Sequence, residues 1–281
     1  MSSNLLDILF KFDYFVCILI GFPLNILLII LIIFKTPKEM KIHSLILIQN
    51  CVLDILLLIV QMFLQAFYIL DTEGNASTIF PNGILLCFMK ENFNPFIFYI
   101  IRLVWAFIFY FNLHGLCVQF IYRYLVLNRN IKITFRRYLF MVSIALFVQT
   151  FYILDLIFFL MPYSNGGIKY FVNFNETWPF IQYEMETINV LSLLPPTLIE
   201  ILAYLIIFIC GFKMAFVPFV NQAGILFFMI YSKTSNNTTN IIRILFQILF
   251  HLTPLFNPII CVLTNTPYRN AIFNRSQINP Q

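Results

Sequence analysis

Seven apolar stretches, each near the length of a membrane-spanning helix, alternate along the chain with polar segments. They cover roughly residues 12–34, 44–70, 96–121, 138–161, 188–212, 214–231 and 241–263. About 20 apolar residues are enough for a helix to cross the hydrocarbon core of a bilayer, and a helix satisfies its own backbone hydrogen bonds there. The pattern predicts an all-α membrane protein, a single seven-helix transmembrane bundle over residues 1–281.

Composition supports the same class. Apolar residues make up 61% of the chain and charged residues only 10%, against about 25% charged in a typical soluble domain. The six cysteines fall mostly inside apolar runs without C-x-x-C spacing, so no metal site is expected. We therefore expect the lipid bilayer, and not nucleic acid, to be the main surroundings of this chain despite its net charge of +5.

Basic residues indicate the orientation. The segment 117–137, CVQFIYRYLVLNRNIKITFRR, is rich in Lys and Arg and contains no acid. Short basic loops remain on the cytoplasmic side. With seven spans and the N-terminus outside, the inner loops and tail contain only one acid, Glu39, and the following basic residues: Lys35, Lys38, Lys41, Arg123, Arg129, Lys132, Arg136, Arg137, Lys213, Arg269 and Arg275. The prediction is a plasma-membrane protein with a cytoplasmic C-terminus.

Acceptor motifs for N-glycosylation agree with this orientation. N-x-S/T sequences in the predicted outer loops begin at Asn75, Asn175, Asn236 and Asn237. One such motif is weak because it is common by chance. Here they follow the second, fourth and sixth spans, and only Asn274 falls on the inner side, where we interpret it as a chance match.

The join between the fifth and sixth spans is very short. Little more than Gly211-Phe212-Lys213 interrupts the apolar stretch 188–231. A single crossing would place the C-terminus outside. Two crossings are favoured because the glycine can end a helix and the lysine can anchor it at the inner face.

Three polar residues lie at a shared depth within the spans. Counted from the inner ends of their helices, Asn25, Asp54 and Asn257 lie roughly 12–15 Å above the inner surface at 1.5 Å per residue. They can form a hydrogen-bonded cluster that joins spans one, two and seven as packing contacts. Pro258 adds a second interpretation, a hinge, because proline frees a carbonyl one turn back. Both interpretations can hold.

The outer half contains a second set of polar residues, Arg102, Asp155 and Glu200. A buried arginine requires a carboxylate partner, so a fixed ion pair between helices is one interpretation. The other is the wall of a ligand pocket. His114 stands alone on an apolar face and is interpreted as a core histidine.

No motif indicates an enzyme. The chain lacks H-E-x-x-H, G-x-S-x-G and a phosphate-binding glycine loop, so we expect no catalysis and no cofactor. A transporter is expected to have matching broken helices in two halves. Pro195-Pro196 interrupts the fifth span without a counterpart earlier in the chain.

Three short motifs resemble a known family. They are NILLIILIIFKTPKEMK at 25–41, Tyr122-Arg123-Tyr124 after the third span, and NPIICVLTNTPYRNAI at 257–272. In this order they resemble the nematode serpentine chemoreceptors of the Str superfamily. LILIQNCVLDIL and YRYLVL are most similar to the Srd class, and Srh- and Sri-like classes come next. The resemblance implies the rhodopsin-like architecture of a G-protein-coupled receptor.

The resemblance also implies a function, the sensing of small environmental molecules at the cilium of sensory neurons with a heterotrimeric G protein as partner. Arg123 takes the place of the arginine that ends the third helix in rhodopsin-like receptors, with Tyr122 where those have an acid. Asn257-Pro258 resembles the NPxxY element, with Cys261 instead of the tyrosine. The residues expected at the coupling surface are Tyr122, Arg123, Tyr124, Arg136, Arg137, Tyr268 and Arg269.

One departure from the family leaves alternatives open. Relatives have a longer basic third inner loop, which is part of the G-protein docking surface, and this chain has only Gly211-Phe212-Lys213. A non-signalling or truncated receptor-like membrane protein is the alternative, followed by a small transporter. In the receptor interpretation, a ligand near Arg102 and Glu200 shifts the helix population and the seventh span bends at Pro258.

Overall fold

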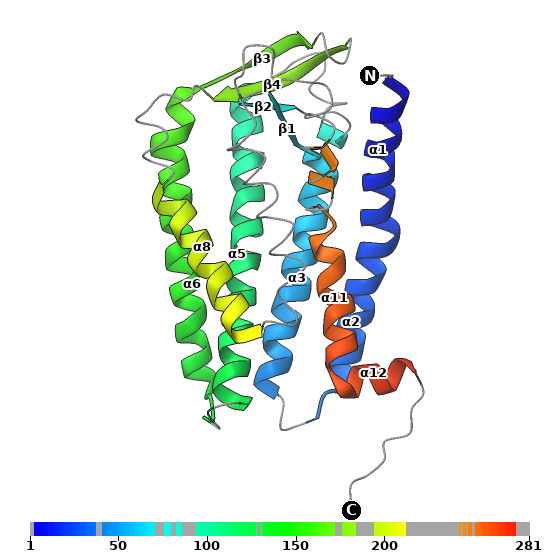
Figure 1. Ribbon diagram of the computed structural model, residues 1–281, viewed down its shortest axis with the longest axis vertical. Coiled ribbons are helices and arrows are strands. Elements are labelled where there is room, and N and C mark those ends of the chain that lie inside the picture. The colour runs from blue at the N-terminus through cyan, green and yellow to red at the C-terminus, as the bar shows by residue number, and fades with distance from the viewer. Residues whose placement is uncertain are drawn as a thin grey trace, which may run out of the picture.

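The computed structural model is an elongated bundle of helices with a small β-sheet across one end (Figure 1). The N-terminal end of the first helix lies at the sheet end, and the last short helix lies at the opposite end. The structure describes residues 3–37, 41–70, 76–79, 83–85, 94–127, 129, 131–171, 176–183, 194–211, 242, 244–245, 247–248 and 251–273.

The first crossing is one continuous helix with a wide turn in its middle. It consists of α1 (Ser3–Val16), the π-helical turn η1 (Cys17–Gly21) and α2 (Phe22–Lys35). Pro23 lies two residues after the wide turn, and proline removes an amide that would bond one turn back. The helix begins nine residues earlier than the predicted residue 12, at Ser3.

The second crossing, α3 (Lys41–Leu64), ends earlier than predicted. The sequence pattern extended this span to residue 70, but Gln65 has a φ of 33°, a left-handed conformation that a helix does not accept. Beyond it, the residues FYIL form strand β1 (Phe67–Leu70). Aromatic and β-branched residues suit a strand, and here a neighbouring loop supplies the pairing partner.

The third crossing is longer than predicted, because α5 (Pro95–Leu127) has 33 residues. At 1.5 Å per residue this is about 50 Å, more than the ~30 Å hydrocarbon core. Tyr122, Arg123 and Tyr124 therefore lie on helix and not in a turn, which corrects the sequence prediction.

The remaining helices complete the bundle. The fourth crossing joins α6 (Phe135–Asp155) to two short turns, η3 (Leu156–Leu160) and η4 (Met161–Tyr163). The others are α8 (Leu194–Gly211), α11 (Thr253–Thr264) and α12 (Thr266–Ile272). Pro195 lies in the first turn of α8, where proline is tolerated. The predicted span 214–231 and the Gly211-Phe212-Lys213 join extend beyond the described residues.

Four described helices are long and apolar enough to cross a membrane: Ile8–Lys35, Ile42–Leu64, Pro95–Val126 and Phe135–Phe159. Their outer surfaces are strongly apolar, as Phe34 (75% exposed) and Phe147 (74% exposed) illustrate. Polar side chains such as Asn25, Asp54 and Gln149 are instead buried. This inverted distribution is the one that a bilayer favours.

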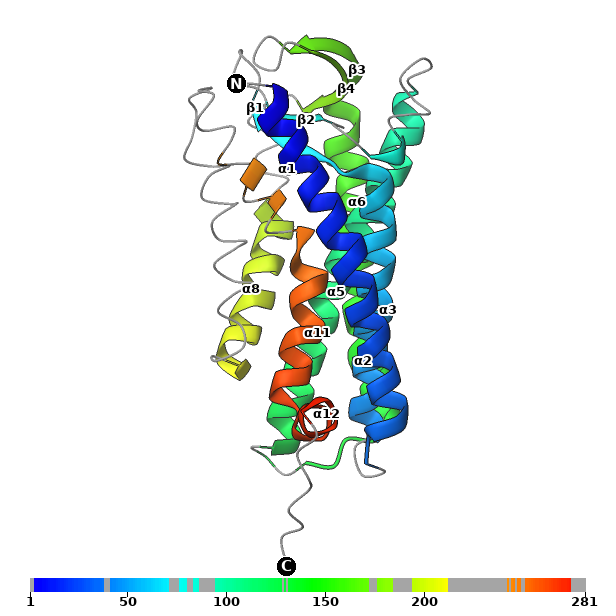
Figure 2. The same ribbon diagram turned by 90° about the vertical axis from the view of Figure 1, so that its right-hand side faces the viewer.

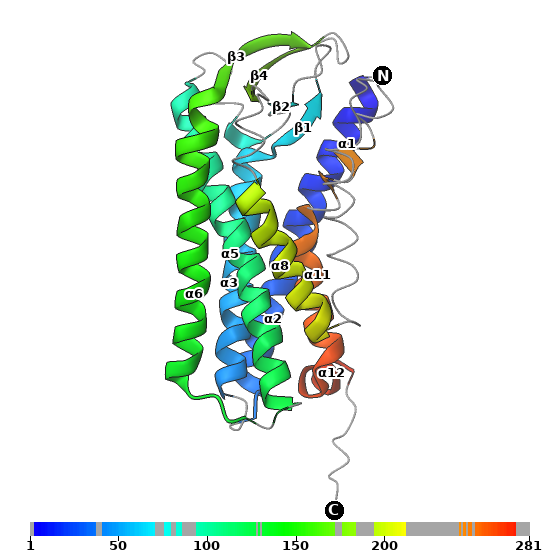
Figure 3. The same ribbon diagram turned by 60° about the vertical axis from the view of Figure 1, so that its left-hand side comes forward.

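Three strands in the predicted outer loops and one at the end of the predicted second span form a four-stranded antiparallel sheet that the sequence pattern did not indicate. Its order is β1-β2-β4-β3, with β2 (Ala76–Ile79), β3 (Ser164–Phe171) and β4 (Glu176–Tyr183). Thr78 of β2 lies opposite Ile181 of β4, so the two outer loops form one unit. The sheet lies over the bundle end (Figure 3), and the fully buried Ile181 packs against Leu64 and Phe98.

Candidate functional site

Asp54, on α3, is the centre of a buried polar cluster. The side-chain amide of Asn257 on α11 donates to both of its carboxylate oxygens, at 3.0 and 3.2 Å. Asn112 on α5 donates a further hydrogen bond to Oδ1. A carboxylate inside a bilayer is expensive unless its oxygens are satisfied, and here two amides from two other helices satisfy it.

Asn25 joins the first crossing to α11 through hydrogen bonds to backbone carbonyls. Its Nδ2 donates to the carbonyl oxygens of Gly21 at 3.0 Å and Pro254 at 2.9 Å. Pro258 has no amide hydrogen, so the carbonyl four residues back, that of Pro254, lacks its helical partner. Asn25 supplies that hydrogen bond. α11 and α2 pack side by side in Figure 2.

The expected cluster of Asn25, Asp54 and Asn257 thus consists of two neighbouring links. Asp54 and Asn257 come together directly, whereas Asn25 bonds to backbone beside Pro258. Asn112 was missed in the sequence, although an isolated amide in an apolar span is itself a signal.

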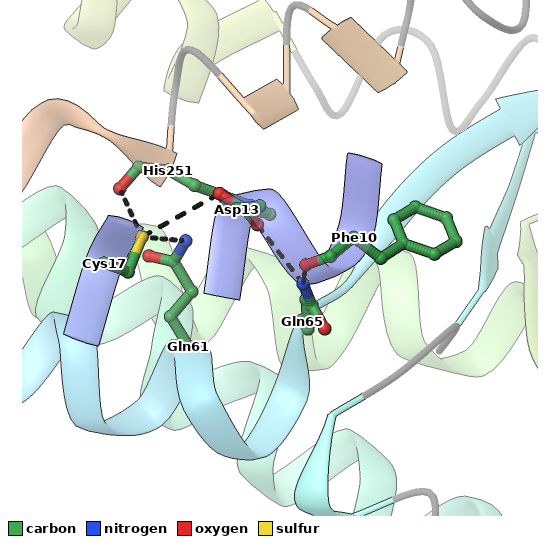
Figure 4. A network of polar contacts seen from close by, with 6 residues as sticks. All are labelled: Phe10, Asp13, Cys17, Gln61, Gln65 and His251. Atoms are coloured by element: carbon green, nitrogen blue, oxygen red, sulfur yellow. Dashed lines mark hydrogen bonds and ion pairs between the residues drawn. The ribbon is translucent and has the colours of Figure 1, made fainter. Parts of the chain in front are cut away.

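A second network lies nearer the outer end of the same helices (Figure 4). Nδ1 of His251, two residues before α11, lies 2.8 Å from Oδ2 of Asp13 on α1. Nε2 of Gln65 donates to the carbonyl of Phe10 at 2.9 Å and approaches Asp13 Oδ2 at 3.4 Å. Asp13 and His251 are only 1% and 5% exposed.

The side chain of Cys17 adds sulfur contacts to this network at the start of the wide turn. The thiol of Cys17, the first residue of η1, approaches Oδ1 of Asp13 and the carbonyl of His251, each at 3.8 Å. Gln61 of α3 donates to the same sulfur at 3.7 Å. The sequence reasoning missed this network; its signal was an acid and a histidine at the outer ends of spans one and seven.

The predicted pocket residues lie on the other side of the bundle, on α5, α6 and α8. Glu200 on α8 hydrogen-bonds with Tyr110 on α5, and the Tyr110 ring centroid lies 4.2 Å from that of Tyr152 on α6. Arg102 and Asp155 act electrostatically on the same Tyr152. Glu200 thus lies beside two tyrosines that were not predicted, whereas a shared pocket with Arg102 and Asp155, and the pairing of Arg102 with a carboxylate, stay predictions.

Arg123 lies at the inner end of α5 among neutral partners. Its guanidinium lies 3.3 Å from Oδ1 of Asn265, between α11 and α12, and 3.5 Å from Nε2 of His43 on α3. The His43 ring stacks on Tyr122, with centroids 5.9 Å apart. Asn265 is held in turn by its own bond to the carbonyl of Cys261 at 2.7 Å. These contacts connect three helices at the inner end.

The other predicted coupling residues lie at the same end. Tyr268 of α12 is 1% exposed and its hydroxyl lies 2.9 Å from that of Thr36; burial raises the pKa of Tyr268 above its ordinary value. Arg136 and Arg137 are exposed in the first turn of α6. Tyr124 and Arg269 are partly buried.

Within the described ranges, no group of three or more His, Cys, Asp or Glu side chains is arranged to hold a metal ion. The predicted glycosylation positions Asn75, Asn175, Asn236 and Asn237 all lie outside the described residues.

A helical bundle with buried polar links between its first, second, third and last helices, capped by a sheet, is a seven-helix receptor fold. The crystal structure of squid rhodopsin is similar to it, with a TM-score of 0.68 over 98% of this chain and 86% of that chain, at 14% sequence identity. This likeness confirms the predicted rhodopsin-like bundle.

The sequence itself gives the family. The family model for the serpentine type 7TM GPCR chemoreceptor Srd matches residues 10–249, and the chain belongs to this family. The predicted Srd-like class is therefore confirmed, and with it the prediction that the chain is a membrane receptor and not an enzyme. No curated protein matches the chain by sequence.

Proposed function

We propose that this chain is a chemosensory receptor that binds a small environmental molecule from the outer side and signals by rearranging its helices. The observation that carries the proposal is the set of contacts along α11. Near its outer start is His251, in its middle Asn257 contacts Asp54, and at its inner end Asn265 contacts Arg123. The helix α11 and the residues that flank its two ends therefore contact polar groups at three depths of the bundle.

The proposed mechanism begins in the outer half, where the ligand contacts the group around Arg102, Asp155 and Glu200. The ligand binds one helix arrangement better than the other and shifts the population between them. α11 then changes its bend at Pro258, where a hydrogen bond from Asn25 takes the place of a helical one. Movement of Asn265 withdraws a partner from Arg123.

The proposed partner at the inner end is a heterotrimeric G protein. Release of Arg123 would expose it beside Arg136 and Arg137, which are already exposed, and beside Tyr122, Tyr124, Tyr268 and Arg269. The polar contacts of Arg123 to a neutral amide and an imidazole are weaker than a charged pair, which suits a contact that must open.

We further propose that the receptor lies in the plasma membrane of a sensory cilium, with the N-terminus outside and sugars on Asn75, Asn175, Asn236 and Asn237. The inner Lys and Arg excess supports the orientation. Glycosidase treatment of the protein from sensory cells should lower its mass, and Gln replacements at the four asparagines should remove that shift. A protein that stays unglycosylated at the cell surface would contradict this topology.

Signalling is tested with the purified chain in lipid nanodiscs together with a panel of heterotrimeric G proteins. Odorant mixtures should raise nucleotide exchange, and Arg123→Ala should abolish the response without loss of folded protein. Persistent absence of exchange with ligand binding intact would favour a non-signalling receptor-like protein. Flux of bound ligand across vesicles would favour a transporter.

A further inference from the structure

An aromatic cluster lies beside the Asp13–His251 contact. Phe10 of α1, Phe67 of β1 and Trp178 of β4 form one buried cluster, at 3%, 1% and 9% exposure. The Phe67 ring lies with its centroid 5.3 Å from that of His251 and 4.6 Å from that of Phe10. An aromatic cluster from the first helix and the capping sheet thus adjoins the His251 ring, which contacts the Asp13 carboxylate.

Gln65 is unusual in two ways at the same place. Its φ of 33° is the one positive value among the described non-glycine residues, and such strain persists only where the surroundings impose it. Its Nε2 bonds to Phe10 and approaches Asp13. Its Oε1 is buried and has no hydrogen-bond partner in the part of the chain that the structure describes. A buried acceptor without a partner among the described residues therefore belongs to the same amide whose nitrogen approaches the carboxylate.

The wide turn η1 begins in the same network, at Cys17. Such π-turns inside α-helices occur frequently at functional sites. The turn brings the Cys17 thiol toward both Asp13 and the His251 carbonyl.

We propose that Asp13, together with the ring of Phe67, binds the ammonium group of a small organic amine, which replaces His251 at the carboxylate. Aromatic faces attract an ammonium ion, the carboxylate neutralises its charge, and Oε1 of Gln65 accepts one of its N–H groups. The inference rests on the proposed receptor function and adds to it the ligand class and a binding site away from Arg102 and Glu200.

Histidine is a suitable partner for such an exchange. Leaving Asp13 without a partner inside the bilayer would be expensive, but the entering ammonium ion takes the place of the imidazole that leaves. Histidine can release its proton to water and remain as a neutral ring, whereas a displaced lysine or arginine would stay charged. The displaced side chain lies two residues before α11, the helix that contains Pro258.

The first experiment compares n-butylamine with 1-butanol, which has the same shape but no charge. The purified full-length chain in lipid nanodiscs is titrated with each compound, and its thermal midpoint is followed. We expect a saturable rise with n-butylamine and none with 1-butanol at equal concentration. Equal effects of the two, or no saturable effect of n-butylamine, trimethylamine or tetramethylammonium, overturn the proposal.

Two substitutions should act in opposite directions. Asp13→Asn should weaken amine binding about 30-fold, because the amide keeps the shape and loses the charge. His251→Gln should tighten it about threefold or more, because the amide can still bond to Asp13 but lacks the aromatic ring that packs against Phe67 and is therefore displaced more readily. A purely structural contact would lower the thermal midpoint in both variants and leave amine affinity unchanged.

His114→Gln is the matched control for His251→Gln, because it replaces a buried histidine on α5 that is not part of the Asp13 network. It should leave amine affinity as it is; loss of binding there, or none with Asp13→Asn, overturns the site. If Asp13→Asn does not fold, the direction of the His251→Gln effect decides.

Nucleotide exchange on G proteins, measured separately, distinguishes this inference from the proposed function. Amine binding through Asp13 without exchange would keep the site and contradict coupling. Exchange driven by a neutral odorant, without amine binding, would keep the receptor and contradict the site.

Discussion

The two sides of the bundle are held together by different kinds of contact. α1, α2, α3 and α11 are joined by polar links at successive depths, from His251–Asp13 through Asn257–Asp54 to the contacts of Asn265. α5, α6 and α8 meet mainly through apolar and aromatic groups, such as Tyr110–Tyr152 and the packing of Cys117 against Ala203.

This difference matters for motion. A hydrogen bond in a low-dielectric interior is directional, and its partners must be replaced together when it breaks. Such links favour discrete arrangements, whereas apolar packing tolerates small shifts and substitutions of similar volume. The polar side is therefore the side on which we expect two alternative states, and the aromatic side acts as its support.

The largest effect is expected from Asp54→Leu, which leaves the amides of Asn112 and Asn257 without their acceptor. Leaving two buried amides without an acceptor should lower the free energy of unfolding by about 3 kcal/mol. Thermal denaturation in detergent measures this. Asp54→Asn, which keeps one acceptor oxygen, should lose less; equal losses, or no loss in either variant, would break the comparison between the two sides.

A smaller effect of about 1–2 kcal/mol is expected from Asn25→Ala, because the Pro254 carbonyl then lacks a donor. The test is a double-mutant cycle with Pro258→Ala, which restores the amide that this carbonyl needs. Asn25→Ala should be about 1 kcal/mol milder in that background. Additive effects of the two substitutions would contradict the hydrogen bond between Asn25 and the Pro254 carbonyl as the cause. Normal signalling by Pro258→Ala would contradict the proposed hinge at Pro258.

On the aromatic side, Tyr110→Phe should lower stability by about 1 kcal/mol, since Glu200 loses a hydroxyl donor. The thermal midpoint measures this, with Tyr124→Phe, outside the cluster, as the control. A loss as large as that of Asp54→Leu would remove the contrast drawn between the two sides.

The proposed ligand-pocket role of the same region is tested by replacing Arg102 and Glu200 together with alanine. The response to a neutral odorant should fall about tenfold or more, because both polar contacts are lost. Cell-surface protein is counted in parallel, and an unchanged response with unchanged surface protein would place the pocket elsewhere.

The smallest effect is expected from Phe147→Leu on α6, because this side chain is 74% exposed on the outer surface of the bundle. Its loss removes contacts with lipid only. The free energy of unfolding, followed by thermal denaturation, should stay within about 0.5 kcal/mol of the original value. Phe98→Leu, at a fully buried position, is the matched comparison and should destabilise by more. A reversed order would mean that the exposed face of α6 packs against protein.

Hydropathy and charge were sufficient to predict the bundle, because crossing a bilayer imposes a length and a composition on each helix. They also located Asp54, Asn257 and Pro258, since polar residues are conspicuous in apolar spans. They did not give the ends of α3 and α5, because Gln65 ends α3 by its backbone conformation and α5 continues in helix beyond the bilayer.

Long-range pairing was the part that the sequence could not provide. Asp13 and His251 are 238 residues apart, and neither has a motif around it. The sheet likewise depends on β2 meeting β4, which requires knowledge of how the helices between them pack. Short strands in polar loops have a weak pattern, so they were interpreted as loops.

The sheet also sets an order for biosynthesis. β2 follows the second crossing, but its partner β4 follows the fourth, so Ala76–Ile79 must wait while α5 and α6 are synthesised and inserted. Until β4 has been synthesised up to Tyr183, the sheet end of the nascent bundle has an unpaired strand edge on β2, which is a site for wrong pairing. A luminal chaperone that shields this edge would act within that interval, between the second and the fifth helix.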